Sequence, residues 1–178
     1  MKKNLLLSLF LVLILAVTIP GCSSGTEDTL SGATEDILAS ILSNADSQLA
    51  GENKLPNSFI DPVTADKAGN MLGLSPSQFN SDVAEAYVSV AAIITHAHQV
   101  ALIKCNDAAA AARVKAAVAA GFDSNKWVCA HPDQSFVIDS GSYVLLVAAK
   151  NVQAEKLLEA FTSLAGKTGS VNVFYRFE

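Results

Sequence analysis

Cys22 follows a glycine at the end of an apolar segment near the start of the chain. Lys2 and Lys3 precede this segment, and Leu5–Val17 is almost unbroken in its apolar character. About a dozen apolar residues after a basic start are typical of a secretory signal peptide. A bilayer span needs roughly 20 such residues. We therefore predict that the leader is removed and does not remain as a membrane helix.

Ile19, Pro20 and Gly21 stand immediately before the cysteine, where bacterial lipoprotein signals carry leucine, a small residue, and glycine or alanine. Pro20 departs from that pattern. The Cys22 thiol would accept a diacylglyceryl group, and the small Gly21 would let the peptidase reach the bond between Gly21 and Cys22. Acyl chains on one residue give durable attachment to a membrane, since each buried methylene contributes about 0.8 kcal/mol. The alternative is an ordinary secretory signal with a chance cysteine.

Three histidines are the candidate metal ligands. His96 and His98 are two positions apart, so on a strand they would share a face. Together with His131 they could form a three-histidine zinc site. No carboxylate-rich or cysteine-rich motif accompanies them, and the alternative is a polar turn between two strands. We therefore predict no metal site, with these histidines as the candidates if one exists.

Cys105 and Cys129 are the thiols that remain once Cys22 is lipidated. Two thiols outside the cytoplasm favour a disulfide. The expected end of a strand at Cys105 and the position of Cys129 after a returning helix could hold the Cα atoms beyond the 7 Å limit. Two small buried side chains are the alternative interpretation. No Cys-x-x-Cys pair supports redox chemistry.

Catalytic and cofactor motifs are missing from the sequence, which contains no nucleophile elbow, phosphate-binding glycine loop or dinucleotide fingerprint. Asp139-Ser140-Gly141 resembles the aspartic-protease motif, but that chemistry needs two carboxylates and the tripeptide occurs once. We predict no catalytic residues and no cofactor.

The chain of 178 residues has a net charge of −5. Without the leader it keeps 10 basic and 17 acidic side chains, which argues against nucleic acid as a partner.

The elements that must position these residues begin after a polar segment. We predict a signal peptide over residues 1–21, the lipidated cysteine and a flexible tether over 22–33, a helix and loop over 34–62, and a globular domain over 63–178. The helix is capped by Thr34 and carries an apolar stripe from Ile37 to Leu49, and the loop covers Gly51–Pro62. We expect the helix to pack on the domain. The alternative is that the helix binds a partner or a membrane surface. The polar face of the helix has no Lys or Arg, which argues against binding to a membrane.

The globular domain is predicted from alternating helix and strand periods. The expected elements are a short helix ending at Gly73, a second one begun by a Ser75–Gln78 capping box, strands Ala86–Ile94 and Gln99–Cys105, a helix Ala108–Ala120 capped by Asp107, strands Phe136–Ile138 and Tyr143–Ala149 joined through Ser140-Gly141, a helix capped by Asn151 and ended by Gly166, and a last strand Val171–Phe177. The order ββαββαβ predicts an α+β fold. It would have two layers, with a mainly antiparallel sheet and helices on one face.

Several of these pieces occur in the order of a known family. They are Gly73-Leu74, Val83–Val88, His96–Lys104, Pro132-Asp133-Gln134 and Gly141–Val147. Over about Ala65 to Phe161 the chain resembles the Gram-positive lipoprotein family catalogued as domain of unknown function 4358. It departs from the family in its shorter, alanine-rich first helix. The resemblance implies a lipoprotein of the outer cell surface and no reaction, ligand or catalytic residue.

The sequence therefore predicts an extracytoplasmic lipoprotein held on the cell membrane by its lipid. The expected role is a binding or envelope structural module, with an envelope protein or a small ligand as partner. The alternative is an envelope enzyme, such as a metal-dependent hydrolase using the histidines.

Overall fold

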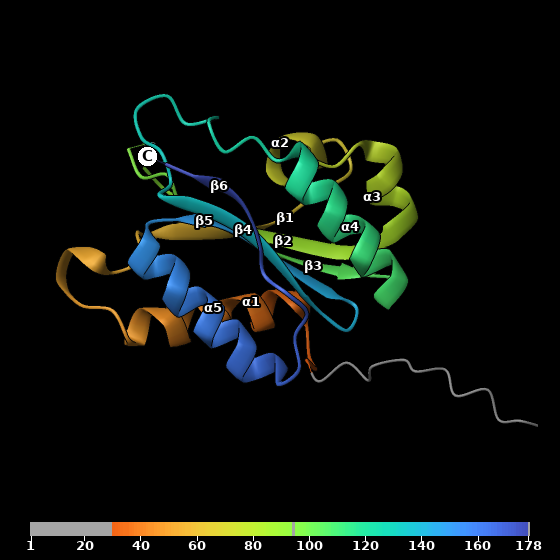
Figure 1. Cartoon of the computed structure of the whole chain (residues 1–178), viewed down its shortest axis with the longest axis horizontal. Helices are drawn as coiled ribbons and strands as arrows, with labels where there is room; N and C mark the ends of the chain where they lie inside the picture. The colour runs from red at the N-terminus through yellow and green to blue at the C-terminus, as the bar shows by residue number, and fades with distance from the viewer. Residues whose placement is uncertain (1–29, 94, 178) are drawn as a thin grey trace, which may run out of the picture.

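A computed structural model of the protein describes residues 30–93 and 95–177 (Figure 1). The helices are α1 (Thr34–Ser47), a single 3₁₀ turn η1 (Gly51–Asn53), α2 (Ala68–Leu72), α3 (Pro76–Asp82), α4 (Ala108–Gly121) and α5 (Asn151–Ala165). The strands are β1 (Ser58–Pro62), β2 (Val83–Ala91), β3 (Gln99–Cys105), β4 (Gln134–Ser140), β5 (Tyr143–Ala149) and β6 (Asn172–Arg176). The predicted α+β class is confirmed.

The six strands form one sheet in the order β1-β2-β3-β5-β4-β6. Every neighbouring pair is antiparallel. The predicted antiparallel hairpin of β4 and β5 is confirmed, although its turn is Gly141-Ser142 because Ser140 still pairs with Tyr143. Gly141 has a φ of +55°, which glycine adopts without the steric cost of a side chain.

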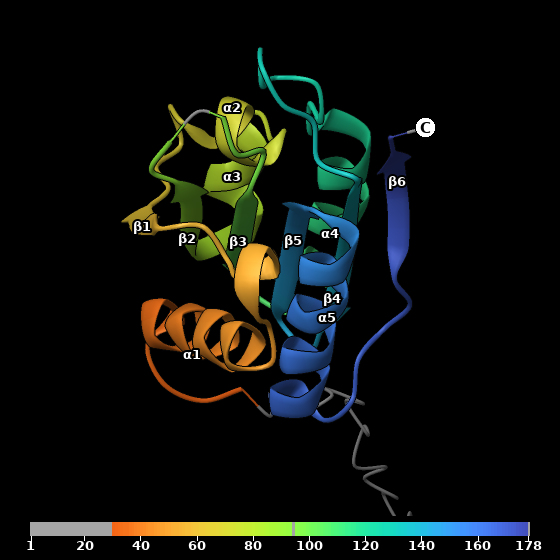
Figure 2. The ribbon, with the colours of Figure 1, turned by 90° about the vertical axis from the view of Figure 1, so that its left-hand side faces the viewer.

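Helices cover both faces of this sheet, so the prediction of two layers with helices on one face is wrong. Figures 1 and 2 show α2, α3 and α4 on one side and α1 and α5 on the other. All seven residues of β5 are buried. Val144, Leu146 and Ala148 belong to the core under α4, while the residues between them belong to the core under α5. A strand that is apolar on both faces needs cover on both.

The N-terminal part belongs to this body and does not stand apart from it. The α1 helix buries its apolar stripe against α5 and the sheet, as predicted. Ser58–Pro62, predicted as loop, forms edge strand β1 paired with β2. Leu30, placed in the tether by the sequence, is 7% exposed and belongs to the same core. Leu30 packs there although the residues around it are polar, because the buried side chains of α1 and α5 form an apolar surface.

Local capping signals were mostly right. The Ser75–Gln78 capping box is present, Asp107 accepts a hydrogen bond from the Ala110 amide at 2.7 Å, and the short α2 helix ends at Gly73. Helix α5 does end at Gly166.

The capping roles predicted for Thr34 and Asn151 are wrong. Thr34 lies inside α1, and its hydroxyl donates to Glu85. The backbone amide of Asn151 donates to the carboxylate of Asp133 at 2.9 Å. A residue from the loop before β4 therefore caps the helix.

The sheet has two ends with different contents. The histidine end is defined as residues 92, 93 and 95–98, residues 122–133 and Lys150. Here the chain leaves β2, enters β3 and β4, and leaves β5 for α5. At the hairpin end, defined as Asp82, residues 105–108 and residues 139–142, the β4–β5 turn lies beside the start of α4. The register pairs Gln99 with Ala148 and Gln134 with Ala149, which places all four residues at the histidine end.

Candidate ligand pocket

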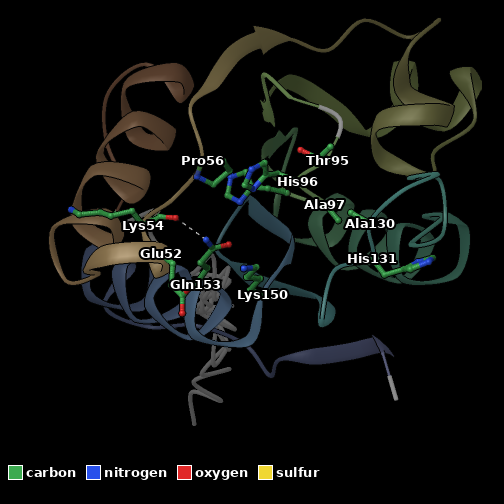
Figure 3. Close-up of a pocket in the computed structure, with 11 residues that line it drawn as sticks. Glu52, Lys54, Pro56, Thr95, His96, Ala97, Ala130, His131, Lys150 and Gln153 are labelled. Atoms are coloured by element: carbon green, nitrogen blue, oxygen red, sulfur yellow. Dashed lines mark hydrogen bonds between the residues drawn. The ribbon is translucent and has the colours of Figure 1, made fainter.

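A pocket of about 160 Å³ opens at the histidine end of the sheet (Figure 3). Its walls come from four segments far apart in the sequence: residues 52–56, the turn 95–98, residues 130–131, and the start of α5 with Lys150 and Gln153. The sequence predicted a turn at 95–98 and a loop before β4, but gave no sign that they meet. The pocket is built by the antiparallel register, which brings these connections to one edge.

His98 is the buried polar group of the pocket. Its side chain is 1% exposed, and neither Nδ1 nor Nε2 makes a hydrogen bond with any described residue. Burial, with a smaller repulsion from His96, lowers the pKa of His98 to about 4. The imidazole is therefore neutral at pH 7, with one N–H donor and one nitrogen acceptor. Leaving both unpaired in a protein interior is costly.

The rest of the lining is rich in cations. Lys54 and Lys150 carry positive charge, while Glu52 is the only carboxylate of the lining. The Lys54 ammonium already binds Asp46 at 2.9 Å. Lys150 is exposed and has no ion pair within the described part of the chain. Its charge is therefore free to act on an occupant of the pocket.

Gln153 holds one wall in place. Its side chain is buried and donates to the carbonyl oxygen of Lys54 at 2.9 Å and to that of Asn53 at 3.3 Å, as the dashed line in Figure 3 indicates for Lys54. These bonds tie η1 to the first turn of α5. The sequence did not predict roles for Gln153 and Lys150, because nothing local distinguishes them from other polar residues at a helix start.

Lys126 anchors the loop that carries His131. Its ammonium donates to Gln99 Oε1 at 2.6 Å and to the Asn70 carbonyl at 2.9 Å. It also lies 4.5 Å from the ring centroid of Phe122 and 5.1 Å from that of Trp127. Burial lowers the pKa of Lys126 to about 8. The loop is therefore fixed against β3 and α2 at the edge of the pocket.

The three candidate histidines line one pocket but do not form a metal centre. The ring of His131 stacks on Phe177, with centroids 5.0 Å apart and planes at 10°, and Figure 3 shows it directed away from His96. Within residues 30–93 and 95–177, no three His, Cys, Asp or Glu side chains are placed to hold a metal ion. The third ligand is lost to an aromatic contact that the sequence did not indicate.

Cys105 and Cys129 are both free thiols, so the possible disulfide does not form in this structure, and the alternative of two small buried side chains holds for Cys105 but not for the exposed Cys129. Cys105 is buried at the hairpin end, where β3 finishes. Cys129 is exposed beside Ala130, which lines the pocket at the other end. Six residues of strand between Gln99 and Cys105 span about 20 Å, well beyond the Cα separation that a disulfide allows.

Gly21 and Cys22, the predicted cleavage and lipidation site, lie outside the described residues. The same holds for the leader and for most of the tether. Among the helices that the structure describes, none has the length and apolar character needed to cross a bilayer.

Comparisons with known proteins found no match to this chain among protein-family models, curated proteins or solved structures. The resemblance to the lipoprotein family of unknown function therefore stays a prediction.

Proposed function

We propose that this protein is an extracytoplasmic lipoprotein, held on the cell membrane through Cys22, whose domain binds a small ligand and catalyses no reaction. The observation that carries the binding role is the pocket around His98, a buried side chain with two unpaired nitrogens. The support for the anchor is the basic, apolar and Gly21-Cys22 sequence at the start of the chain.

The acidic balance of the chain supports a lipid as the means of attachment. With 17 acidic side chains against 12 basic ones, including the two in the leader, the protein has little charge attraction to anionic lipid. Attachment would then depend on the acyl chains, each of which adds binding free energy with every buried methylene.

Membrane fractionation of a Cys22→Ser variant tests the anchor. We expect the variant to appear in the soluble fraction, or to be retained only with its leader uncut, while the parent sediments with membranes. Cys129→Ser is the matched control, because it removes an exposed thiol of the domain and should sediment like the parent. A Cys22→Ser protein that is processed and still sediments fully would refute the anchor.

The second candidate is an envelope metal-dependent hydrolase. It is favoured by the presence of His96, His98 and His131 in one pocket, and weakened by the stacking of His131 on Phe177. Metal analysis of the purified protein discriminates between the two. Stoichiometric zinc that is lost in His96→Ala would support the hydrolase, whereas a zinc-free protein that still binds a ligand supports the binding module.

A further inference from the structure

We propose that the pocket at the histidine end binds a small oxyanion, a carboxylate or phosphate group, with His98 as hydrogen-bond donor and Lys150 as the countercharge. This inference rests on the proposed binding function and adds the chemical class of the ligand. Three observations carry it: the unpaired ring of His98, the excess of cations in the lining, and the size of the cavity.

His98 supplies the strongest argument. A buried donor without a partner costs free energy, and such groups in native proteins call for an occupant such as a ligand, ion or water. His98 is one of the residues that line the pocket, and its backbone is held in place because its carbonyl oxygen accepts from the backbone amide of Ala91 at 3.3 Å. An oxyanion accepts the N–H bond with the added strength of its charge.

The charges around the ring select an anion over a cation. Lys150, whose ammonium has no ion pair within residues 30–93 and 95–177, lines the pocket, and His96 lies close enough to His98 to affect its protonation. The one opposing carboxylate in the lining is that of Glu52. Asp133, which precedes β4, already accepts the Asn151 amide. A cation would find few oxygen ligands here, whereas an anion would find a lysine and a ring donor.

The cavity admits a ligand of several atoms. One water needs roughly 10–15 Å³ of space measured in this way, and the pocket offers about 160 Å³. A phosphate ion or a short dicarboxylate therefore fits beside the ring. The apolar lining is restricted to Pro56 and to two alanines, Ala97 and Ala130, which is too little to favour a large apolar ligand.

Imidazole NMR of the purified full chain in detergent tests the proposal directly. The chain has three histidines, so single substitutions to glutamine assign each ring. Inorganic phosphate and succinate are titrated separately at pH 7 and constant ionic strength, with chloride as the balancing anion. We expect a saturable shift of the His98 ring nitrogens with at least one of the two, and the comparison identifies the phosphate or carboxylate class. His131, stacked on Phe177, should move least.

Two lysine variants on one segment separate binding from general charge. Lys150→Gln should weaken the apparent affinity about tenfold or more, the scale of a hydrogen bond to a charged group. Lys156→Gln removes the same charge from α5, where the ammonium pairs with Glu159 at 2.7 Å, and should leave the affinity unchanged. Both substituted side chains lie outside the core, so both variants should fold.

Three results would overturn the proposal. They are the absence of a saturable His98 shift with either anion, a response confined to His131, and equal weakening by Lys150→Gln and Lys156→Gln. The first of these results rejects the proposal even where zinc binds His96 and His98. Failure here leaves the fractionation of Cys22→Ser unaffected, so the ligand and the anchor are tested separately.

Discussion

The two ends of the sheet differ in whether their polar side chains have bonding partners. At the hairpin end, Asp82 binds Arg113 at 2.6 Å and Asp139 binds Lys115 at 2.6 Å. At the histidine end, the buried ring of His98 has no hydrogen-bond partner among the described residues, and Lys150 has no ion pair with any of them. The hairpin end thus has these charged side chains paired, whereas the histidine end keeps His98 and Lys150 without such partners beside the bonded Lys126 and Asp133.

Further bonds at the hairpin end involve the backbone. The Cys105 amide donates to the Ser142 carbonyl at 2.8 Å, and the Gly169 amide donates to that of Asp139 at 2.8 Å. The bond from Arg113 holds the pKa of Asp82 below its ordinary value. The Asp139 motif that resembles a protease is therefore part of a paired structural cluster.

The contrast separates structural polar groups from those available to a ligand. Charged groups that already have partners would have to lose them in order to bind anything else. Groups left without partners in a buried site gain the most from an occupant. The histidine end is for this reason the better candidate for function, and four measurements can break or sharpen the distinction.

The largest expected effect is a loss of stability in acid, caused by His98. Its pKa is about 4 in the folded protein, below the ordinary 6.5, so the unfolded chain binds more protons between these values. The contribution is complete above about pH 6.5 and is lost as the pH falls towards 4. A pKa lowered from 6.5 to about 4 corresponds to about 3 kcal/mol of stability. Urea unfolding at a series of pH values measures it.

His98→Leu removes the titrating group and its two unpaired nitrogens. We expect this variant to keep its stability at pH 7 and to lose much less of it between pH 6.5 and 4, whereas the exposed His131→Gln should behave like the parent. An equally steep acid loss in His98→Leu would assign the effect to other groups.

A smaller effect is expected where two helix ends meet near the histidine end. A Cβ atom on Gly121 would lie only 2.2 Å from the carbonyl oxygen of Gly73. Gly121→Ala must therefore push the backbone apart, at a cost of about 2 kcal/mol. Denaturant midpoints measure it. Gly51→Ala is a poor control because its φ is +58°, while Gly69→Ala, which meets nothing closer than 3.8 Å, should change stability much less.

The hairpin end should respond to loss of a helix cap. Asp107→Ala removes the bond to the Ala110 amide and should destabilise the protein by about 1 kcal/mol. Asp107→Ser, which retains a capping oxygen, should recover most of this in the same unfolding assay. An unchanged unfolding midpoint for Asp107→Ala would mean that packing at the hairpin end stabilises α4 without the cap.

The reactivity of the two thiols compares the hairpin end, which holds Cys105, with the histidine end, which holds Cys129, without altering the stability of the protein. Burial, and then the charge of Asp82, raise the pKa of Cys105 to about 12, whereas Cys129 is exposed. A thiol reagent should label Cys129 quickly in the folded protein and Cys105 only after unfolding. Mass spectrometry locates the label. Absence of any free thiol in the unfolded, unreduced protein would restore the disulfide.

The sequence predicted the structure correctly where the relevant contacts are local. The capping box of Ser75 and Gln78 spans one helical turn, and the strand Gln99–Cys105 was predicted with its observed bounds. It failed where a distant partner decides the outcome. Asp133 replaced Asn151 as the cap of α5, and a second layer of helices was missed because apolar alternation marks a strand's burial but not which helix covers it.

By itself, the sequence determined the α+β class and a mainly antiparallel sheet, because helical and strand periods, turns and caps act over a few residues. It also supplies the predicted lipid site at Cys22, whose chemistry needs only its neighbours. The tertiary structure alone decided that His98 would be buried without a partner, that Lys150 would join it in one pocket, and that His131 would turn to Phe177. These outcomes depend on strand register and helix packing, which bring together residues that are distant in the chain.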